Sequence, residues 1–156
     1  MIAILGIGQS LRGDDAAGLK AVEHWQSLYP ASANTPDVRV ELLELPGLAL
    51  LDYLEGAQQV LLVDAVRSGA APGNLHLLCE AELAAFATGS GSAHGWGVAE
   101  ALALGRKMYP EKMPALVDIL GSAAGDVSLG EALSAGVQAA LDPAAAMIAA
   151  WLDEKE

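Results

Sequence analysis

The sequence has little cysteine, few aromatic residues and few basic residues. Its single cysteine, Cys79, excludes an internal disulfide and a zinc site built from cysteines. The apolar run around Cys79 predicts a small, buried side chain. Aromatic residues make up only 4% of a chain that is 53% hydrophobic, so the core must consist mainly of Leu, Val, Ile and Ala. This composition favours helices packed on a sheet and argues against disorder.

Basic residues are too few to balance the acidic ones. The chain carries 8 Lys and Arg against 20 Asp and Glu, a formal net charge of -12. Such a surface repels phosphate backbones, so we expect no nucleic-acid partner. Two explanations of the acidity stay open. It could serve solubility alone, or it could favour a partner with a basic surface.

The sequence also lacks a secretory signal and a convincing membrane span. No basic segment precedes an apolar one at the start, and the cysteine usage fits a reducing compartment, so we expect a cytoplasmic location. Residues 132–152 are largely apolar, but Gln138, Asp142 and Pro143 interrupt them. Polar groups inside a bilayer are costly, so we predict a packed helix and no membrane insertion.

Short apolar runs alternate with helical patterns along the chain. The strands are predicted at residues 2–7, 38–43, 59–63, 74–79 and 115–120, and helices at 14–28, 48–55 and 97–108. This alternation predicts an α/β fold of three layers, with a largely parallel sheet of about five strands, in one domain over residues 1–156. The order of the strands cannot be predicted from these patterns.

A final helix is predicted from a capping box. Ser128 and Glu131 have the Ser-x-x-Glu spacing that opens helices. Apolar residues then recur every four positions and predict one buried face: Leu129, Leu133, Val137 and Leu141. Pro143 is expected to bend or interrupt this helix.

Two acidic residues and one histidine stand where ligands collect in α/β folds. Asp15 follows the first predicted strand, Asp64 follows the third, and His94 lies in a Gly/Ser-rich segment before a helix. Ligands of open α/β sheets bind beyond the carboxyl ends of the strands. Two carboxylates and an imidazole could therefore converge on one ion, such as zinc, nickel or cobalt, with positions left open for water or substrate.

A purely structural interpretation of the same residues stays open. Asp14 and Asp15 could cap a helix, Asp64 could bond a turn, and His94 could lie in a loop without a role.

A nucleotide site is a weaker alternative. Gly6 and Gly8 fit the start of a Gly-x-Gly-x-x-Gly motif, but Leu11 occupies the third glycine position, and no Gly-Lys-Ser/Thr motif occurs. Asp14 and Asp15 would also oppose a phosphate at the start of the helix. We therefore expect the small residues to form a tight turn with room for a substrate backbone. The remaining histidines, His24 and His76, are predicted to be structural.

Three motifs, in the same order, resemble those of the nickel-iron hydrogenase maturation endopeptidases. They are Leu-Gly-Ile-Gly-Gln-Ser-Leu-Arg-Gly-Asp-Asp-Ala-Ala-Gly at residues 5–18, Leu-Val-Asp-Ala at 62–65 followed by Ala-Pro-Gly at 71–73, and Ser-Ala-His-Gly-Trp-Gly at 92–97. The resemblance extends over nearly the whole chain. It implies a phosphorylase/hydrolase-like α/β/α sandwich.

The resemblance also implies a function. Members of the family remove a C-terminal extension from the hydrogenase large-subunit precursor after nickel has been inserted. The nickel is supplied by the substrate, and zinc or cadmium could replace it in crystals. Carried over by motif, Asp15, Asp64 and His94 would be both the catalytic residues and the metal ligands. Either the metal or a carboxylate would then activate water in an aspartic-type endopeptidase.

The chain departs from the family pattern at three places. Gln9 stands where many members have Asn, and the loops at 44–47 and 121–125 differ from the usual sequences. These loops are expected to contact substrate, so the departures bear on which precursor is cut. A non-catalytic, metal-sensing chaperone or binding module for the large subunit is the main alternative function, and an enzyme acting on a nucleotide ligand is a third.

Overall fold

The computed structural model describes residues 1–44, 46–87, 97–130 and 132–156. At its centre is one sheet whose strands follow the order β2-β1-β3-β5-β4. The strands are β1 (Ile2–Gly8), β2 (Val38–Glu44), β3 (Gln59–Val66), β4 (Leu75–Cys79) and β5 (Leu116–Ala123). All neighbouring pairs are parallel except β4 with β5, which is antiparallel. The predicted largely parallel sheet of about five strands is confirmed.

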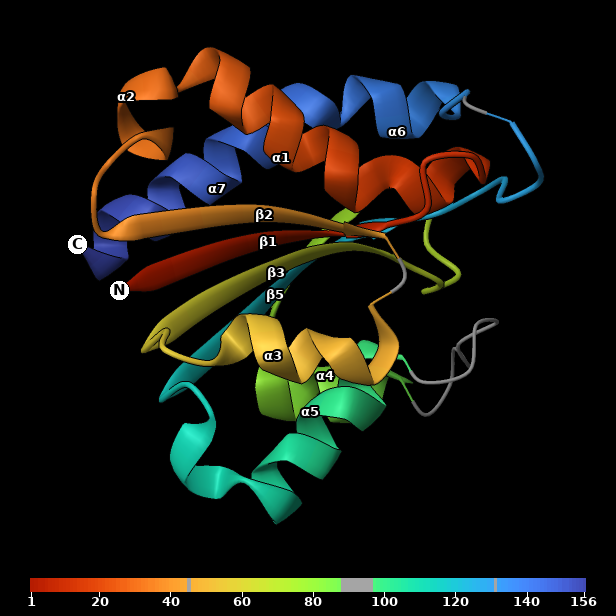
Figure 1. Ribbon diagram of the computed structural model, residues 1–156. Coiled ribbons are helices and arrows are strands. Elements are labelled where there is room, and N and C mark those ends of the chain that lie inside the picture. The colour runs from red at the N-terminus through yellow and green to blue at the C-terminus, as the bar shows by residue number, and fades with distance from the viewer. Residues whose placement is uncertain (45, 88–96, 131) are drawn as a thin grey trace.

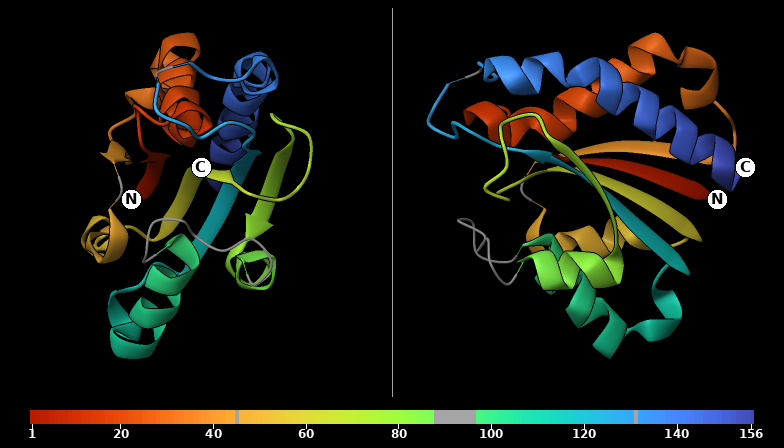
Figure 2. Two further views of the ribbon diagram at one scale, coloured as in Figure 1. Left: turned by 90° about the vertical axis from the view of Figure 1, so that its right-hand side faces the viewer. Right: turned by 180° about the vertical axis from the view of Figure 1, so that it is seen from behind.

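Helices cover both faces of this sheet (Figure 1). On one face lie α1 (Ala17–Leu28) and α7 (Leu141–Lys155); on the other lie α3 (Leu50–Leu54), α4 (Glu80–Ala87) and α5 (Val98–Met108). The view from the side in Figure 2 shows the two helical layers separated by the sheet, which confirms the three-layer α/β/α arrangement. The shorter elements are Gly13–Ala16, Pro30–Ala33 (α2), Gly47–Ala49, Pro110–Lys112 and Ala135–Ala139 (α6).

The alternation of side chains along β1 explains why a separate core forms on each face of the sheet. β1 is buried along its whole length. Ile2 and Ile4 belong to the core under α1 and α7, which contains Trp25. Ala3 and Leu5 belong to the opposite core, under α3 and α5. Successive residues of a strand point to opposite faces, so a continuous apolar run is the pattern required of a strand covered on both sides.

The strand order creates a crossover next to β1. The chain passes from β1 to β2 on one side, and then returns to place β3 on the other side of β1. The carboxyl ends of β1 and β3 therefore lie next to each other at the point where the order reverses. In parallel α/β sheets this is the place where ligands bind.

Two strands are longer than predicted. β3 runs to Val66 and β5 to Ala123, three residues past the expected ends in each case. Asp64 therefore lies within β3, paired with Gly121 of β5, and not directly after the strand as predicted. The ladder can continue through an acidic residue because its side chain lies at the end of the sheet and is only partly buried.

The prediction for Cys79 was wrong. Its side chain is exposed at the end of β4. β4 is an edge strand, so part of its surface is not covered by a neighbour, and an apolar run on such a strand does not guarantee burial. The sequence prediction also did not include α4, which begins directly after Cys79.

The predicted start of the final helix was also wrong. Ser128 does not open a helix; α6 begins at Ala135 and α7 at Leu141. Gly130 has a φ of 144°, and Leu129 is 81% exposed instead of lying on a buried face. Pro143 lies in the first turn of α7, where its missing N–H has no intrahelical partner to lose. The break between α6 and α7 precedes it.

No helix in the described part of the chain is both long enough and apolar enough to span a bilayer. The helix predicted over residues 132–152 is packed against the sheet: Ala145, Ile148 and Leu152 of α7 are fully buried.

Candidate active site

Asp15 and Asp64 lie together at the crossover. Asp15 is in the short helical turn that follows β1, and its carbonyl accepts a hydrogen bond from the backbone N–H of Gln9 (3.1 Å). Asp64 is on the neighbouring strand β3. The two carboxylates are close enough for the charge of Asp15 to affect the titration of Asp64. Both are half-buried residues, and the carboxyl group of Asp64 is largely removed from solvent.

The environment of Asp64 favours its protonated form. Burial raises the pKa of this carboxyl from 3.8 to about 8. The backbone N–H of Ala65, which donates to Oδ1 of Asp64 (2.8 Å), opposes the rise, and the nearby charge of Asp15 adds to it. A positive charge placed beside such a carboxyl favours its ionised form and so lowers its pKa. The pair is therefore suited to a cation.

Glycines of the first motif allow the chain to approach the ends of the strands. A Cβ added to Gly8 would lie 2.2 Å from the carbonyl oxygen of Asp15. One added to Gly18 would lie 2.2 Å from the carbonyl oxygen of Val63 and 2.3 Å from that of Ile7. We expected these small residues to make room for a substrate backbone. They instead make room for the chain's own backbone, and so bring Asp15 and the start of α1 against β1 and β3.

Asp14 has a different role from its neighbour, one that the sequence did not reveal. It is fully buried, and its carboxylate accepts four hydrogen bonds. Oδ2 accepts from the N–H groups of Gly125 (2.8 Å) and Asp126 (3.2 Å) and from the hydroxyl of Ser134 (2.7 Å), while Oδ1 accepts from the N–H of Ser134 (2.7 Å). Consecutive residues of a helical turn point in different directions. One acid of the pair can therefore face the crossover while the other faces away from it.

We call residues 124–130 the return loop, because they bring the chain back from β5 to the first motif. Arg12 and Gly130 form an isolated parallel bridge, in which Gly13 donates to Gly130 and Gly130 donates to Leu11. The N–H of Asp14 donates to the carbonyl of Asp126 (2.8 Å). These contacts explain why Ser128 does not start a helix: the backbone of the return loop is already bonded to the first motif.

The second motif also contacts this region. A Cβ on Gly125 would lie 2.7 Å from Cγ of Pro72 and 3.3 Å from Oδ2 of Asp14. Gly73, with a φ of 91°, has its Cα so near the carbonyl of Gly136 that an added Cβ would lie 2.1 Å from that oxygen. The Pro-Gly turn thus fits against the return loop and the start of α6, and residues from both motifs hold the same region together.

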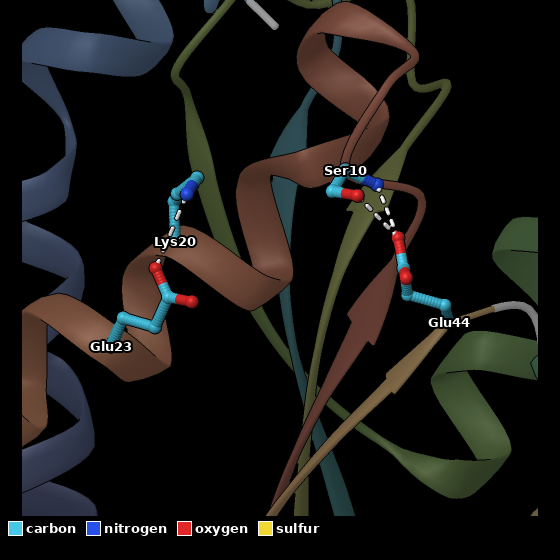
Figure 3. Close-up of polar contacts among 4 residues, drawn as sticks. All are labelled: Ser10, Lys20, Glu23 and Glu44. Atoms are coloured by element: carbon cyan, nitrogen blue, oxygen red, sulfur yellow. Dashed lines mark hydrogen bonds and ion pairs between the residues drawn. The ribbon is translucent and has the colours of Figure 1, made fainter.

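Ser10 and Glu44 form a polar contact at the edge of the site. Both the N–H (2.8 Å) and the hydroxyl (2.5 Å) of Ser10 donate to one oxygen of Glu44, as Figure 3 shows. These bonds lower the pKa of the exposed Glu44 carboxyl. They join the end of β2, where the divergent loop 44–47 begins, to the first motif. The ion pair of Lys20 with Glu23 in the same figure lies on the surface of α1.

The three histidines differ in where they lie relative to the candidate site. His24 of α1 contacts Asp142 of α7, which agrees with a structural role for His24. His76 lies in β4 and pairs with Gly121 of β5, the same residue that pairs with Asp64 of β3. His94, the third predicted ligand, lies outside the described residues. Within the described ranges, no three His, Cys, Asp or Glu side chains form a group that could hold a metal.

Comparisons with known proteins give a consistent result. A family model described as hydrogenase maturation protease matches residues 33–151, more than half of the chain. The hydrogenase 2 maturation protease of Escherichia coli is 29% identical over 98% of this chain and 91% of its own length. A solved structure of the hydrogenase maturating endopeptidase HybD from E. coli superposes with a TM-score of 0.79 at 26% identity, over 99% of this chain and 93% of that one.

A further relative matches only in part. The hydrogenase expression/formation protein HupD of Bradyrhizobium diazoefficiens is 36% identical over 87 residues, which are 54% of this chain and 43% of that protein. The chain thus spans less than half the length of this relative.

Proposed function

The chain belongs to the hydrogenase maturation protease family, and we propose on that premise that it removes a C-terminal extension from the large-subunit precursor of a nickel-iron hydrogenase after nickel insertion. In this proposal the nickel arrives with the substrate. Asp15, Asp64 and His94 complete its coordination and bring the bond to be cut beside it. We also propose that the reaction takes place in the cytoplasm, because the chain's cysteine usage suits a reducing compartment.

The observation that supports this proposal most is the meeting of Asp15 and Asp64 at the crossover. Without a cation, Asp64 is mostly protonated at pH 7, because its pKa is about 8. Binding of nickel would favour loss of that proton and so convert Asp64 into a ligand. Cleavage would then depend on nickel, since a precursor that lacks it cannot be positioned at the carboxylates.

A second observation agrees with a substrate at this place. The carboxylate of Asp14 and the backbone N–H groups of residues 9, 10 and 12–15 in the first motif are hydrogen-bonded within the protein. By contrast, Oε1 of Gln9 is buried and has no donor in the described part of the chain. Gln9 is bonded through its backbone to Asp15. Because solvent does not reach this oxygen, an N–H of the bound polypeptide could pair with it only after the Gln9 side chain has moved. In the hydrolysis itself, water adds its oxygen to the peptide carbonyl carbon, the C–N bond breaks, and the new amine takes up a proton.

The test is cleavage of purified, nickel-loaded precursor, followed by mass spectrometry. The unmodified protein should shorten the precursor, and nickel-free precursor should stay intact. Asp15→Asn and His94→Ala should each slow cleavage by roughly a thousandfold or more while leaving the circular dichroism spectrum unchanged. His24→Ala is the matched control, because this histidine lies on α1 with Asp142 as its partner, and it should keep the normal rate.

Two results would count against the proposal. Cleavage that proceeds normally in the Asp15 and His94 variants would remove these residues from the mechanism. Stable binding of the precursor without any shortening would favour the alternative of a non-catalytic chaperone.

A further inference from the structure

Two leucines next to the candidate site are unusually exposed. Leu129 is 81% exposed, and Leu11 is 55% exposed. Single apolar residues on a surface are ordinary, whereas contiguous apolar patches with a polar rim are a feature of interaction sites. Leu11 belongs to the first motif and Leu129 to the return loop, so they are far apart in the sequence.

The parallel bridge brings the two leucines side by side. Arg12 pairs with Gly130, and the residues that precede each of them are Leu11 and Leu129. The N–H of Gly130, the residue that follows Leu129, donates to the carbonyl of Leu11 (2.8 Å), so the backbones at the two leucines are adjacent, and both side chains are exposed. The side chain of Arg12 also contacts the return loop, because its Nε donates to the carbonyl of Val127 (3.2 Å). The two leucines therefore form one small apolar surface, which we call the leucine pair.

The backbone under the leucine pair is held firmly. The buried carboxylate of Asp14 binds the N–H groups of Gly125 and Asp126, on the N-terminal side of Leu129, and both donors of Ser134 on its C-terminal side. On the other segment, Arg12 donates to the carbonyl of Gln9, and Asp15 donates to that of Arg12. A surface that is ordered before binding loses less conformational entropy in a complex. This surface is also in the same loop as Asp15, four residues from Leu11.

From these contacts we propose that the leucine pair is the docking surface for the precursor, whose apolar side chain near the cut packs between Leu11 and Leu129 with basic residues around it. The proposal rests on the proposed function. The basic residues follow from charge: the chain has a net charge of -12, and Asp126, three positions before Leu129 in the return loop, is exposed. An apolar centre with a polar, charge-complementary rim is the usual composition of a specific interface.

The experiment measures cleavage kinetics with nickel-loaded precursor for Leu11→Ser, Leu129→Ser and the double variant. Each single change should raise KM about tenfold, and the double change about a hundredfold, because each removes a buried leucine contact from the complex. The value of kcat and the melting temperature should stay unchanged, since both side chains are exposed in the free protein. Leu28→Ser is the matched control: this leucine is 52% exposed at the far end of α1, and its loss should leave KM unaltered.

Binding of the precursor to an Asp15→Asn background separates this inference from the proposed function. The Kd should rise with the leucine changes and should also rise with added salt. If KM and Kd were unchanged in the leucine variants, the docking surface would be refuted. Cleavage by the unmodified protein would still support the proposed function. If the unmodified protein bound the precursor without cutting it, the proposed function would fail and the same Kd comparison would still decide the docking surface. Affinity that is independent of salt would refute the basic rim.

Discussion

The surroundings of Asp14 and of Asp64 differ in one decisive respect, the number of hydrogen-bond donors that meet the carboxylate. Both acids lie at the carboxyl edge of the sheet, and both are removed from bulk water to a large degree. Asp14 accepts four hydrogen bonds from the return loop and Ser134. Among the described residues, the carboxylate of Asp64 accepts one hydrogen bond, from the N–H of Ala65, and it also faces the charge of Asp15.

This contrast separates a structural acid from an acid that is suited to a ligand. A buried carboxylate with a full set of donors is stable as an anion and has little capacity left for a further partner. A buried carboxylate with few donors is stable only when it is protonated or when a cation is present. The two regions use the same residue type for opposite purposes, and the donors around each acid determine which purpose it serves.

The largest expected effect on stability comes from removing Asp14, the acid whose carboxylate accepts four hydrogen bonds. Asp14→Ala should lower the free energy of unfolding by about 3 to 5 kcal/mol, because four donors of the return loop and Ser134 lose their charged partner. Urea unfolding measures the change. Asp126→Ala is the control, since this exposed carboxylate accepts a hydrogen bond from the N–H of Ser128 (2.9 Å) in its own loop, and the loss of stability should be small. A stable Asp14→Ala protein would break the contrast between the two acids.

A smaller effect of opposite sign is expected at Asp64. Its pKa rises from 3.8 in the unfolded chain to about 8 in the folded one. Between pH 4 and pH 8 the folded state holds a proton that the unfolded state has released, so this residue makes the protein less stable as the pH rises. Asp64→Asn removes that dependence. The variant should match the unmodified protein near pH 4 and exceed its stability by about 2 kcal/mol above pH 8.

Melting curves across this pH range provide the measurement. Asp118→Asn serves for comparison: Asp118 is on β5, its carboxylate accepts a bond from Nε1 of Trp151 (2.8 Å), and it lies away from the crossover. Parallel stability profiles for the Asp64→Asn and unmodified proteins would show that Asp64 has an ordinary pKa. The distinction from Asp14 would then disappear.

The smallest effect is expected at Glu44, the exposed carboxylate at the edge of the site, which extends the comparison to an acid in contact with water. Ser10→Ala removes one of two donors to Glu44, so the pKa of Glu44 should move up toward its ordinary value. Carboxyl-carbon NMR titration measures this shift. The melting temperature should not change, because solvent replaces the lost bond. Lys20→Ala should leave the titration of Glu44 as it was; an equal shift there would mean that Ser10 has no particular influence.

Local patterns predicted most of the elements because those elements are defined by local chemistry. β1 is an unbroken apolar run and is buried throughout, as expected of a strand covered on both faces. The errors fall where long-range contacts decide. Ser128 has a good capping-box spacing, yet the return loop pairs with the first motif. Cys79 lies in an apolar run, yet its strand is at the edge of the sheet and leaves it exposed.

The candidate site was predictable in part for the same reason. Asp15 and Asp64 each follow or end an apolar strand pattern, and this placed both at one edge of a parallel sheet. The antiparallel direction of β4 and the role of Asp14 had no comparable signal, because each depends on residues about forty or more positions away. The prediction that His94 completes the ligand set stays a prediction.

The sequence by itself determined which segments are strands, that β1 is buried on both faces, and that two carboxylates lie near the carboxyl ends of two strands. The tertiary structure alone decided that these two strands are neighbours, and that of the adjacent pair Asp14 and Asp15 one is buried among donors while the other lies at the crossover. Side-chain alternation and helical periodicity are properties of a few consecutive residues. Strand pairing and the supply of hydrogen-bond donors come from distant parts of the chain, so only the folded molecule fixes them.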